Sequence, residues 1–161
     1  MAGYLKIGDI KGQAGDTDHK EWIELLSVGQ IARRPMSTGS GGQASRQQSA
    51  VELPPIQVTK QLDKSTPKLL EAVCKGTTFP EVEIHLCTSE GEGRKPYFKV
   101  KLKHVKVSDL ALSASAQAGM GDSESLALNY TEIEWTYTSF GADGKSTGDM
   151  KATWKVAEGT T

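Results

Sequence analysis

Apolar and polar residues alternate along three stretches of the chain. The apolar positions are Val82, Ile84 and Leu86 in the first stretch, Phe98, Val100 and Leu102 in the second, and Met150, Ala152, Trp154 and Val156 in the third. A period of two is the signature of a β-strand, because successive side chains of a strand point to opposite faces of the sheet. Each stretch therefore predicts a strand with one buried and one polar face.

Two longer runs change phase part-way along. The apolar positions pass from even to odd numbers between Leu102 and Val105, and again between Tyr130 and Ile133. A strand keeps one face inward across such a slip only if it contains a β-bulge or bends from one sheet into another. Two slips in a chain of 161 residues indicate sharply curved strands, as in a barrel.

Turn residues separate the predicted strands. Asp143 and Gly144 lie in a glycine-rich loop that suits a hairpin connection. Residues 89–94 separate the first two alternating stretches. If these stretches pair symmetrically about Glu92, opposite charges face each other across the strands, Glu83 with Lys101 and Glu81 with Lys103.

One segment, at about residues 65–75, departs from the strand pattern and predicts a short helix. Its signals are a cap at Ser65 or Thr66, Pro67 in the first turn and Gly76 at the stop. Its apolar face is formed by Leu69, Leu70 and Val73. We expect this face to pack against the open side or end of the barrel.

The segment from Met36 to Ser49 has almost no large apolar side chain and is rich in Gly, Ser and Gln. Such a composition cannot contribute to a core, and a loop of this length in a compact domain is a mobile linker or a contact element. The chain is therefore expected to be one domain, residues 1–161, with an extended mobile loop at about 34–50. Its fold class is mainly β: a compact antiparallel β-barrel of two curved sheets with one short flanking helix.

Composition adds limits on function. Lys and Arg number 19 against 20 Asp and Glu, a formal net charge of -1, whereas nucleic-acid binders usually carry a basic excess. Cys74 and Cys87 are too few for a disulfide framework; a reduced state is the simpler interpretation, and one bridge stays open. The N-terminus shows no Sec-type signal peptide, and no window reaches the roughly 18 apolar residues of a membrane span.

Candidate chemical sites are each incomplete. Residues 141–147 approach a P-loop, but the first glycine falls on Ser139 and a strand follows instead of a helix, so a hairpin loop is the better interpretation. His85 and Cys87 share a strand face, yet a zinc site needs about four ligands, or three plus water. No serine lies in a GxSxG elbow. We expect no enzyme, no cofactor and no metal.

The three histidines and a run of lysines have ordinary structural explanations. His19 lies in a polar turn where solvation accounts for it, His85 on an outward strand face and His104 at the first phase slip. A lysine stripe comprises Lys99, Lys101, Lys103 and Lys106. Neighbouring glutamates can neutralise this stripe, which indicates a solvated or subunit-contacting face and not a nucleic-acid site.

The order of short motifs carries a resemblance. The chain opens with Lys6-Ile7-Gly8-Asp9-Ile10-Lys11-Gly12, followed by Asp16, His19 and a strand at 23–26. The helix entry Leu62-Asp63-Lys64-Ser65-Thr66-Pro67, the runs Val105–Ser108 and Leu126–Tyr130 and a final strand at Trp154 follow in order. In this order the chain resembles the Hcp family, the tube proteins of bacterial type VI secretion. The resemblance covers residues 5–156, although Gly12-Gln13-Ala14 replaces a frequent Gly-Glu-Ser and Pro54-Pro55 moves the next strand start to Ile56.

The resemblance implies a function without an active site. Hcp subunits form homo-hexameric rings that stack into a tube, which a contractile sheath expels with a spike at its tip, and the lumen can hold small effector proteins. Such a protein starts in the bacterial cytoplasm and is secreted without a Sec signal peptide. The resemblance implies neither nucleic-acid binding nor membrane insertion.

Two sets of residues are the expected contact sites within this family. The ring-stacking loop comprises Ser37, Gly39, Gly41, Gly42, Gln43 and Ser45. The lumen-side strand candidates are Ser27 and Gly29. The alternative function is a small β-barrel that binds a ligand or an oligonucleotide, which needs a ligand-facing aromatic platform that this chain does not clearly provide.

Overall fold

The computed structural model describes residues 2–35, 50–88, 94–116 and 121–156. These residues contain nine strands and one helix, in the order β1 (Ala2–Ile7), β2 (Ile23–Leu25), β3 (Ser27–Gly29), β4 (Ile56–Gln61), α1 (Thr66–Lys75), β5 (Thr78–Cys87), β6 (Pro96–Ser113), β7 (Ser123–Asn129), β8 (Glu132–Phe140) and β9 (Ser146–Lys155). All pairings between these strands are antiparallel. In this part of the chain, no helix is long and apolar enough to cross a membrane.

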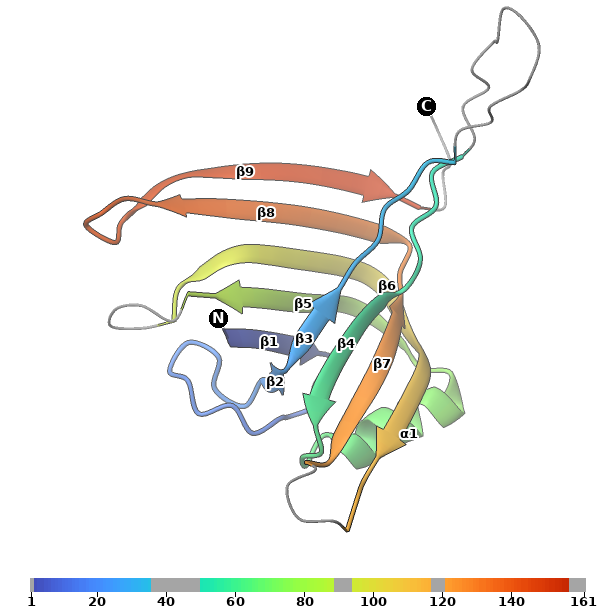
Figure 1. Ribbon diagram of the computed structural model, residues 1–161. Helices are drawn as coiled ribbons and strands as arrows, with labels where there is room; N and C mark the ends of the chain where they lie inside the picture. Colours follow the sequence, from blue (N-terminus) through green and yellow to red (C-terminus); the bar gives the residue numbers. More distant parts are fainter. Residues whose placement is uncertain (1, 36–49, 89–93, 117–120, 157–161) are drawn as a thin grey trace, which may run out of the picture.

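The strands form two layers that share β6 (Figure 1). We call β2, β1, β5, the first half of β6, β8 and β9 the long layer, in their order of pairing. The second half of β6 with β7, β4 and β3 forms the short layer, which crosses in front of the long layer in Figure 1. The inner faces of both layers meet in one apolar core.

The path of paired strands closes on itself through the chain. It begins at β2 and ends at β3, and Leu26 alone separates these two strands in the sequence. The Leu26 amide donates to the Thr59 carbonyl of β4 at 2.7 Å, so the corner itself is bonded to the short layer. The predicted compact barrel of two curved sheets with one helix is thereby confirmed.

Both predicted phase slips are bends between the layers. At the first, β6 stays one continuous strand, and His104 takes a left-handed conformation with φ 50° where β6 leaves β8 and joins β7. At the second, the extended strand is interrupted at Tyr130 and Thr131. On one side of this corner β7 pairs with β4, and on the other side β8 pairs with β9. A left-handed residue or a break lets the apolar side chains remain inward on either side of the bend.

The predicted register and turn are confirmed. Glu83 lies opposite Lys101 and Glu81 opposite Lys103, as the charge pattern indicated. The β8–β9 hairpin turns at Asp143 and Gly144, with φ 70° at the glycine. β4 begins at Ile56, after the two prolines.

Helix α1 confirms the predicted stop, the proline near its start and two residues of its apolar face, because Leu69 is buried and Val73 packs against the core. Gly76 takes the left-handed conformation, with φ 63°. Ser65 occupies the N-cap without a capping hydrogen bond, and its hydroxyl donates instead to Asp63 at 2.5 Å. Leu69 is fully buried, whereas Leu70 is 39% exposed, because Thr66, Leu69 and Ala72 form the buried face. The placement of Leu70 on that face was wrong.

A buried ion cluster joins the helix entry to the short layer. The Lys60 ammonium on β4 is fully buried and donates to Glu124 on β7, and to Asp63 at 2.9 Å and Thr66 at 3.3 Å. The Thr66 hydroxyl donates to the same Glu124 oxygen at 2.9 Å. Burial of a charge is costly unless it is paired, so the cluster holds α1, β4 and β7 in one arrangement.

We predict that Lys60→Met destabilises the fold by about 3–5 kcal/mol, because it leaves two carboxylates without their cation. The measurement is urea unfolding followed by circular dichroism. Lys68→Met, which breaks the exposed pair with Glu71, is the matched control and should leave the midpoint almost unchanged. Equal shifts for both variants would show that the buried cluster has no special role.

Candidate subunit interface

The core face of the long layer continues past the short layer onto the β8–β9 hairpin. Strand register places one apolar or small residue from each strand in a single row across the layer: Leu25, Gly3, Leu86, Phe98, Tyr137 and Met150. Exposure rises along this row. Leu25 is 9% exposed, whereas Tyr137 is 48% and Met150 is 78% exposed. The row therefore leaves the core as it approaches β9, and we call it the open row.

The neighbouring row on this face repeats the trend. Ile84, Val100, Trp135 and Ala152 lie opposite one another, and burial falls from Ile84 to the exposed Ala152. The sequence pattern placed Met150 and Ala152 on a buried face, and this was wrong. The strand exists as predicted, but β9 extends beyond the layer that could cover it.

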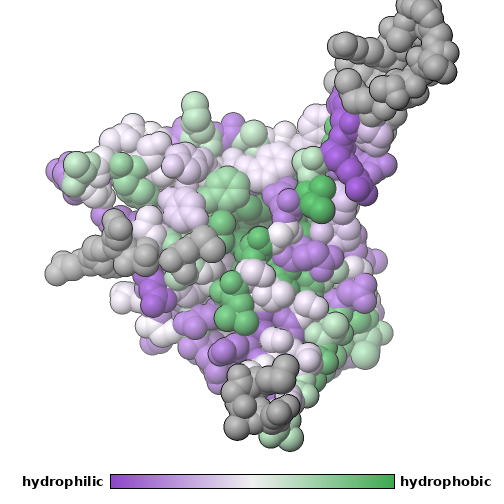
Figure 2. Space-filling view, in the orientation of Figure 1, coloured by the Kyte–Doolittle hydropathy of each residue, from purple (hydrophilic) through white to green (hydrophobic). Residues whose placement is uncertain are grey.

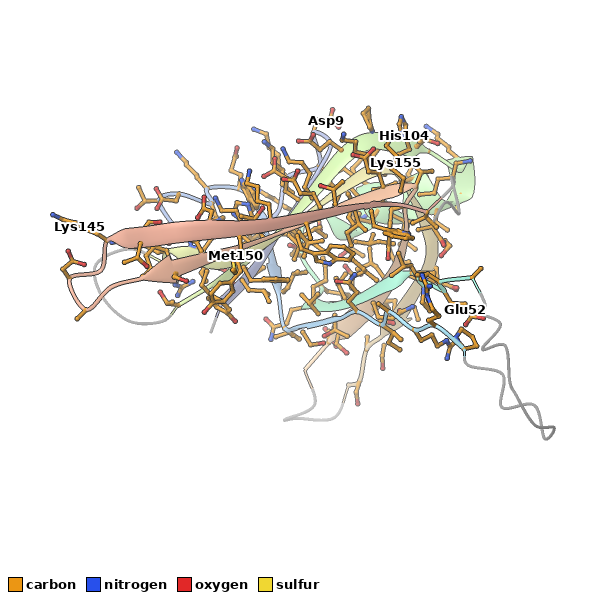
Figure 3. All side chains as sticks on the ribbon, turned by 90° about the horizontal axis from the view of Figure 1, so that it is seen from above. Asp9, Glu52, His104, Lys145, Met150 and Lys155 are labelled. Carbon is orange, nitrogen blue, oxygen red and sulfur yellow. The ribbon has the colours of Figure 1, made fainter. Side chains whose placement is uncertain are left out.

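Two views show the uncovered face. Figure 2 looks onto it and shows apolar surface exposed in a hollow in the middle of the face. In Figure 3, Met150 lies on the side of β9 that faces the short layer, and Lys155 lies on the opposite side. Leu26 and Ile31, each 57% exposed, add apolar surface at and beyond the β2–β3 corner. An exposed apolar patch of this kind is typical of a contact site.

The outer edge of β9 has no partner strand among the described residues, where β9 pairs with β8 only. An exposed edge presents free backbone N–H and C=O groups that can bond to another chain. The exposed end of the open row, at Tyr137 and Met150, and this edge lie on the same hairpin. Together they offer a second molecule both apolar contact and strand pairing.

The outward face of the long layer is strongly charged. One row reads Lys6, Glu83, Lys101, Glu134 and Thr153, and the next reads Glu81, Lys103, Glu132 and Lys155. Lys103 pairs with Glu132 at 2.8 Å and Lys101 with Glu81 at 3.4 Å. These contacts confirm that glutamates neutralise part of the lysine stripe. The hydrogen bond to Glu132 holds the pKa of the Lys103 ammonium above its ordinary value, and the same bond to Lys103 holds the pKa of the Glu132 carboxyl below its own ordinary value.

The outward face of the short layer has a different chemistry. Its three rows are Ser27, Thr59, Ser125 and Ala111; Gly29, Gln57, Ala127 and Asp109; and Gln61, Ser123 and Ser113. In these rows Asp109 is the single charged residue. The lumen-side candidates Ser27 and Gly29 both lie here, exposed, and Ser27 exchanges a 2.6 Å hydrogen bond with Thr59. The sequence offered these two residues as candidates but gave no signal for the neutral face that surrounds them, because that face is assembled from β3, β4, β6 and β7.

The predicted stacking residues Ser37, Gly39, Gly41, Gly42, Gln43 and Ser45 lie outside the described residues. The structure does describe the base of their segment. Arg33 and Glu52 pair through both backbone groups, at 3.1 and 2.8 Å, and through their side chains at 2.7 Å. The segment therefore leaves and re-enters the domain at one point, labelled by Glu52 in Figure 3.

The candidate chemical residues are placed differently from expectation. His19 is only 2% exposed, and so it is not a solvated turn residue. It contacts His85 and Cys87, but among the described residues no group of three His, Cys, Asp or Glu side chains could hold a metal. Both cysteines are free: Cys87 is buried, which raises the pKa of its thiol to about 11, and Cys74 is exposed and not packed as expected.

Comparison with known proteins decides the family. Residues 4–137 match the family described as "Type VI secretion system effector, Hcp". The protein hcp1 of Pseudomonas aeruginosa is 32% identical over 158 residues, which cover 96% of this chain and 94% of that protein.

The chain belongs to the Hcp family.

Solved structures agree with this assignment. A structure described as a type six secretion system protein matches with a TM-score of 0.90 and 27% identity, covering 99% of this chain and 98% of that chain. Hcp1 from Salmonella typhimurium shares the fold with a TM-score of 0.78 at 20% identity, covering 98% and 95%. The chain is thus a β-rich tube protein of type VI secretion, a family of structural, secreted proteins, as the motif order indicated.

Proposed function

We propose that this Hcp protein forms hexameric rings in which the open row and the β9 edge of one copy are covered by the next copy. The single observation that carries this is the exposed end of the open row, at Tyr137 and Met150. Apolar surface on two adjacent strands favours a partner that removes it from water. A ring requires two different patches on each subunit, because a head-to-tail contact closes by rotation.

We further propose that the neutral outward face of the short layer lines the lumen and holds small effector proteins. Ser27 and Gly29 lie in the middle of hydroxyl, amide and small side chains. Such groups form hydrogen bonds with effector proteins of either net charge. The small side chains also leave space for an effector in the lumen. The charged outward face of the long layer would instead suit contacts whose charges are fixed, with neighbouring rings, the sheath or the spike.

The alternative function, a ligand- or oligonucleotide-binding barrel, fits less well. Side chains fill the barrel interior, where Leu5, Ile84, Leu102 and Ile133 are fully buried. A lipocalin-like barrel instead keeps an internal cavity for its ligand. The lysines Lys101 and Lys103 are paired with glutamates, which leaves little basic surface there for phosphate.

We predict that Met150→Asp disrupts the hexamer without unfolding the subunit. Because Met150 is 78% exposed, the new carboxylate costs the isolated subunit little, but it is expected to weaken assembly at least ten-fold when buried against a neighbour. Native mass spectrometry measures the fraction near six times 17.3 kDa. Thr153→Asp adds the same charge on the opposite face of β9 and should assemble as the unchanged protein does. A full hexamer fraction for Met150→Asp would contradict this interface.

We predict that deletion of residues 37–49 leaves rings intact and prevents their stacking into tubes. The pair Arg33–Glu52 brings the two ends of the segment together, so the shortened connection can close without displacing β3 or β4. Electron microscopy of tubes and native mass of rings are measured on the same sample. Loss of the rings themselves would refute a role restricted to stacking.

A further inference from the structure

A second apolar cluster lies on the outward face of the long layer, away from the main core. Tyr4 and Cys87 are fully buried there, under Ala14 and the partly buried Trp22. These last two belong to residues 11–22, which we call the covering loop. Four backbone bonds shape the loop: the Gly12 amide donates to Glu21 at 2.7 Å, the Ala14 amide to Trp22 at 3.0 Å, the Glu21 amide to Ala14 at 3.1 Å and the Trp22 amide to His19 at 3.0 Å.

Four titratable side chains fasten the covering loop to β5 in a continuous series. Asp16 contacts Nδ1 of His19 at 2.6 Å, Nε2 of His19 contacts Nδ1 of His85 at 2.9 Å, and Nε2 of His85 contacts Glu83 at 3.3 Å. The side chains of His19 and His85 are 2% and 12% exposed. The His19 ring stacks on Tyr4 with centroids 4.3 Å apart, which fixes its orientation. We call Asp16, His19, His85 and Glu83 the latch.

The number of ring protons decides how many latch contacts are hydrogen bonds. Two neutral imidazoles carry two N–H groups for three contacts, so one contact lacks a proton. One added proton gives three N–H groups: His19 then donates to Asp16 and to His85, and the Nε2–H of His85 faces the Glu83 carboxylate at 3.3 Å. A second added proton places the N–H of His19 and that of His85 face to face across 2.9 Å. With one added proton every contact of the latch therefore has an N–H group, whereas the second added proton makes the contact between His19 and His85 repulsive.

The surroundings resist the second proton. Burial, then the neighbouring His19, then Lys99, Lys6 and Lys101 lower the pKa of His85 from 6.5 to about 4. The other titratable and charged groups around the pair are Asp16 and Asp18 in the loop, Tyr4 on β1, Glu83 and Cys87 on β5, Arg94 before β6, and Glu134, Asp149 and Lys151 across the pocket beside His85. Thr136 lines that pocket as well.

We propose that the latch is an acid-sensitive fastening that holds the covering loop over β1 and β5 and releases it when both histidines become charged. Release exposes Tyr4, Trp22 and the Cys87 thiol while the main core stays folded. The latch lies on the outward face of the long layer between the covering loop and β5, whereas the proposed contact between adjacent copies lies at Tyr137 and Met150 on the β8–β9 hairpin.

The direction of the pH dependence follows from the lowered pKa of His85. In the open loop His85 returns toward its ordinary value of 6.5, so the open form binds more protons than the closed form between pH 6.5 and about 4. The equilibrium constant for opening therefore rises as pH falls through this interval, by up to about ten-fold per pH unit. Below about pH 4 it stops rising, because both forms are then protonated.

The test measures access to the Cys87 thiol in a Cys74→Ser background, which removes the exposed cysteine. The reagent is 4,4′-dithiodipyridine, which reacts with thiols in acid, and each rate is divided by that of a small thiol at the same pH. The normalised rate should rise steeply from pH 6.5 to 4 while far-ultraviolet circular dichroism stays constant. A flat normalised rate would overturn the proposal.

Two variants and one further measurement separate the latch from general acid loosening. His85→Asn keeps an amide near the Nδ1 position but cannot be charged, so its normalised rate should lose the pH dependence. His104→Asn, at an exposed left-handed position that asparagine tolerates, should keep it. Hydrogen exchange of the unmodified protein should show the Gly12, Ala14 and Glu21 amides accelerating before those of β5 and β6. An unchanged slope in His85→Asn, or exchange that accelerates everywhere together, contradicts the latch.

Discussion

The need to cover an apolar sheet face governs this molecule. The long layer presents one core face across β2, β1, β5, β6, β8 and β9, whereas the short layer has only the second half of β6, β7, β4 and β3 to place against it. The side chains that lie between the layers are fully buried, and those beyond the short layer are not. Because burial of apolar surface is the main stabilising term in folding, the uncovered end at Tyr137 and Met150 is a surface suited to association.

The rest of the architecture keeps that uncovered end in place. His104 turns β6 from one layer into the other, and the corner at Tyr130 and Thr131 does the same between β7 and β8. Leu26 closes the barrel between β2 and β3. The hairpin therefore extends from a closed barrel, and it presents its apolar side in one direction. A contact of fixed direction is what a closed ring requires.

The two outward faces divide the remaining tasks. The charged rows of the long layer carry ion pairs within the subunit, such as Lys103 with Glu132, and the covering loop adds a second small core on that side. The outward face of the short layer carries Ser27, Gly29 and their neighbours, most of which are uncharged. This difference between the two faces is the basis of the proposed division between fixed partners on one side and variable cargo on the other.

Local features could be predicted from the sequence, and features that depend on distant parts of the chain could not. The alternation around Ile84 and Val100, the pairing of Glu83 with Lys101 and the stop at Gly76 are set by neighbours in the sequence or across one turn. The exposure of Met150 depends on where the short layer ends, and the contact of His19 with His85 joins residues 66 positions apart. Neither has a local signal.

The most direct measurement is a cryo-electron microscopy structure of the assembled ring. We expect Tyr137 and Met150 buried against the adjacent copy, β9 paired with a strand of that copy, and Ser27 and Gly29 facing the lumen. A ring in which Met150 stays exposed to solvent, or in which the charged face of the long layer lines the lumen, would contradict the account.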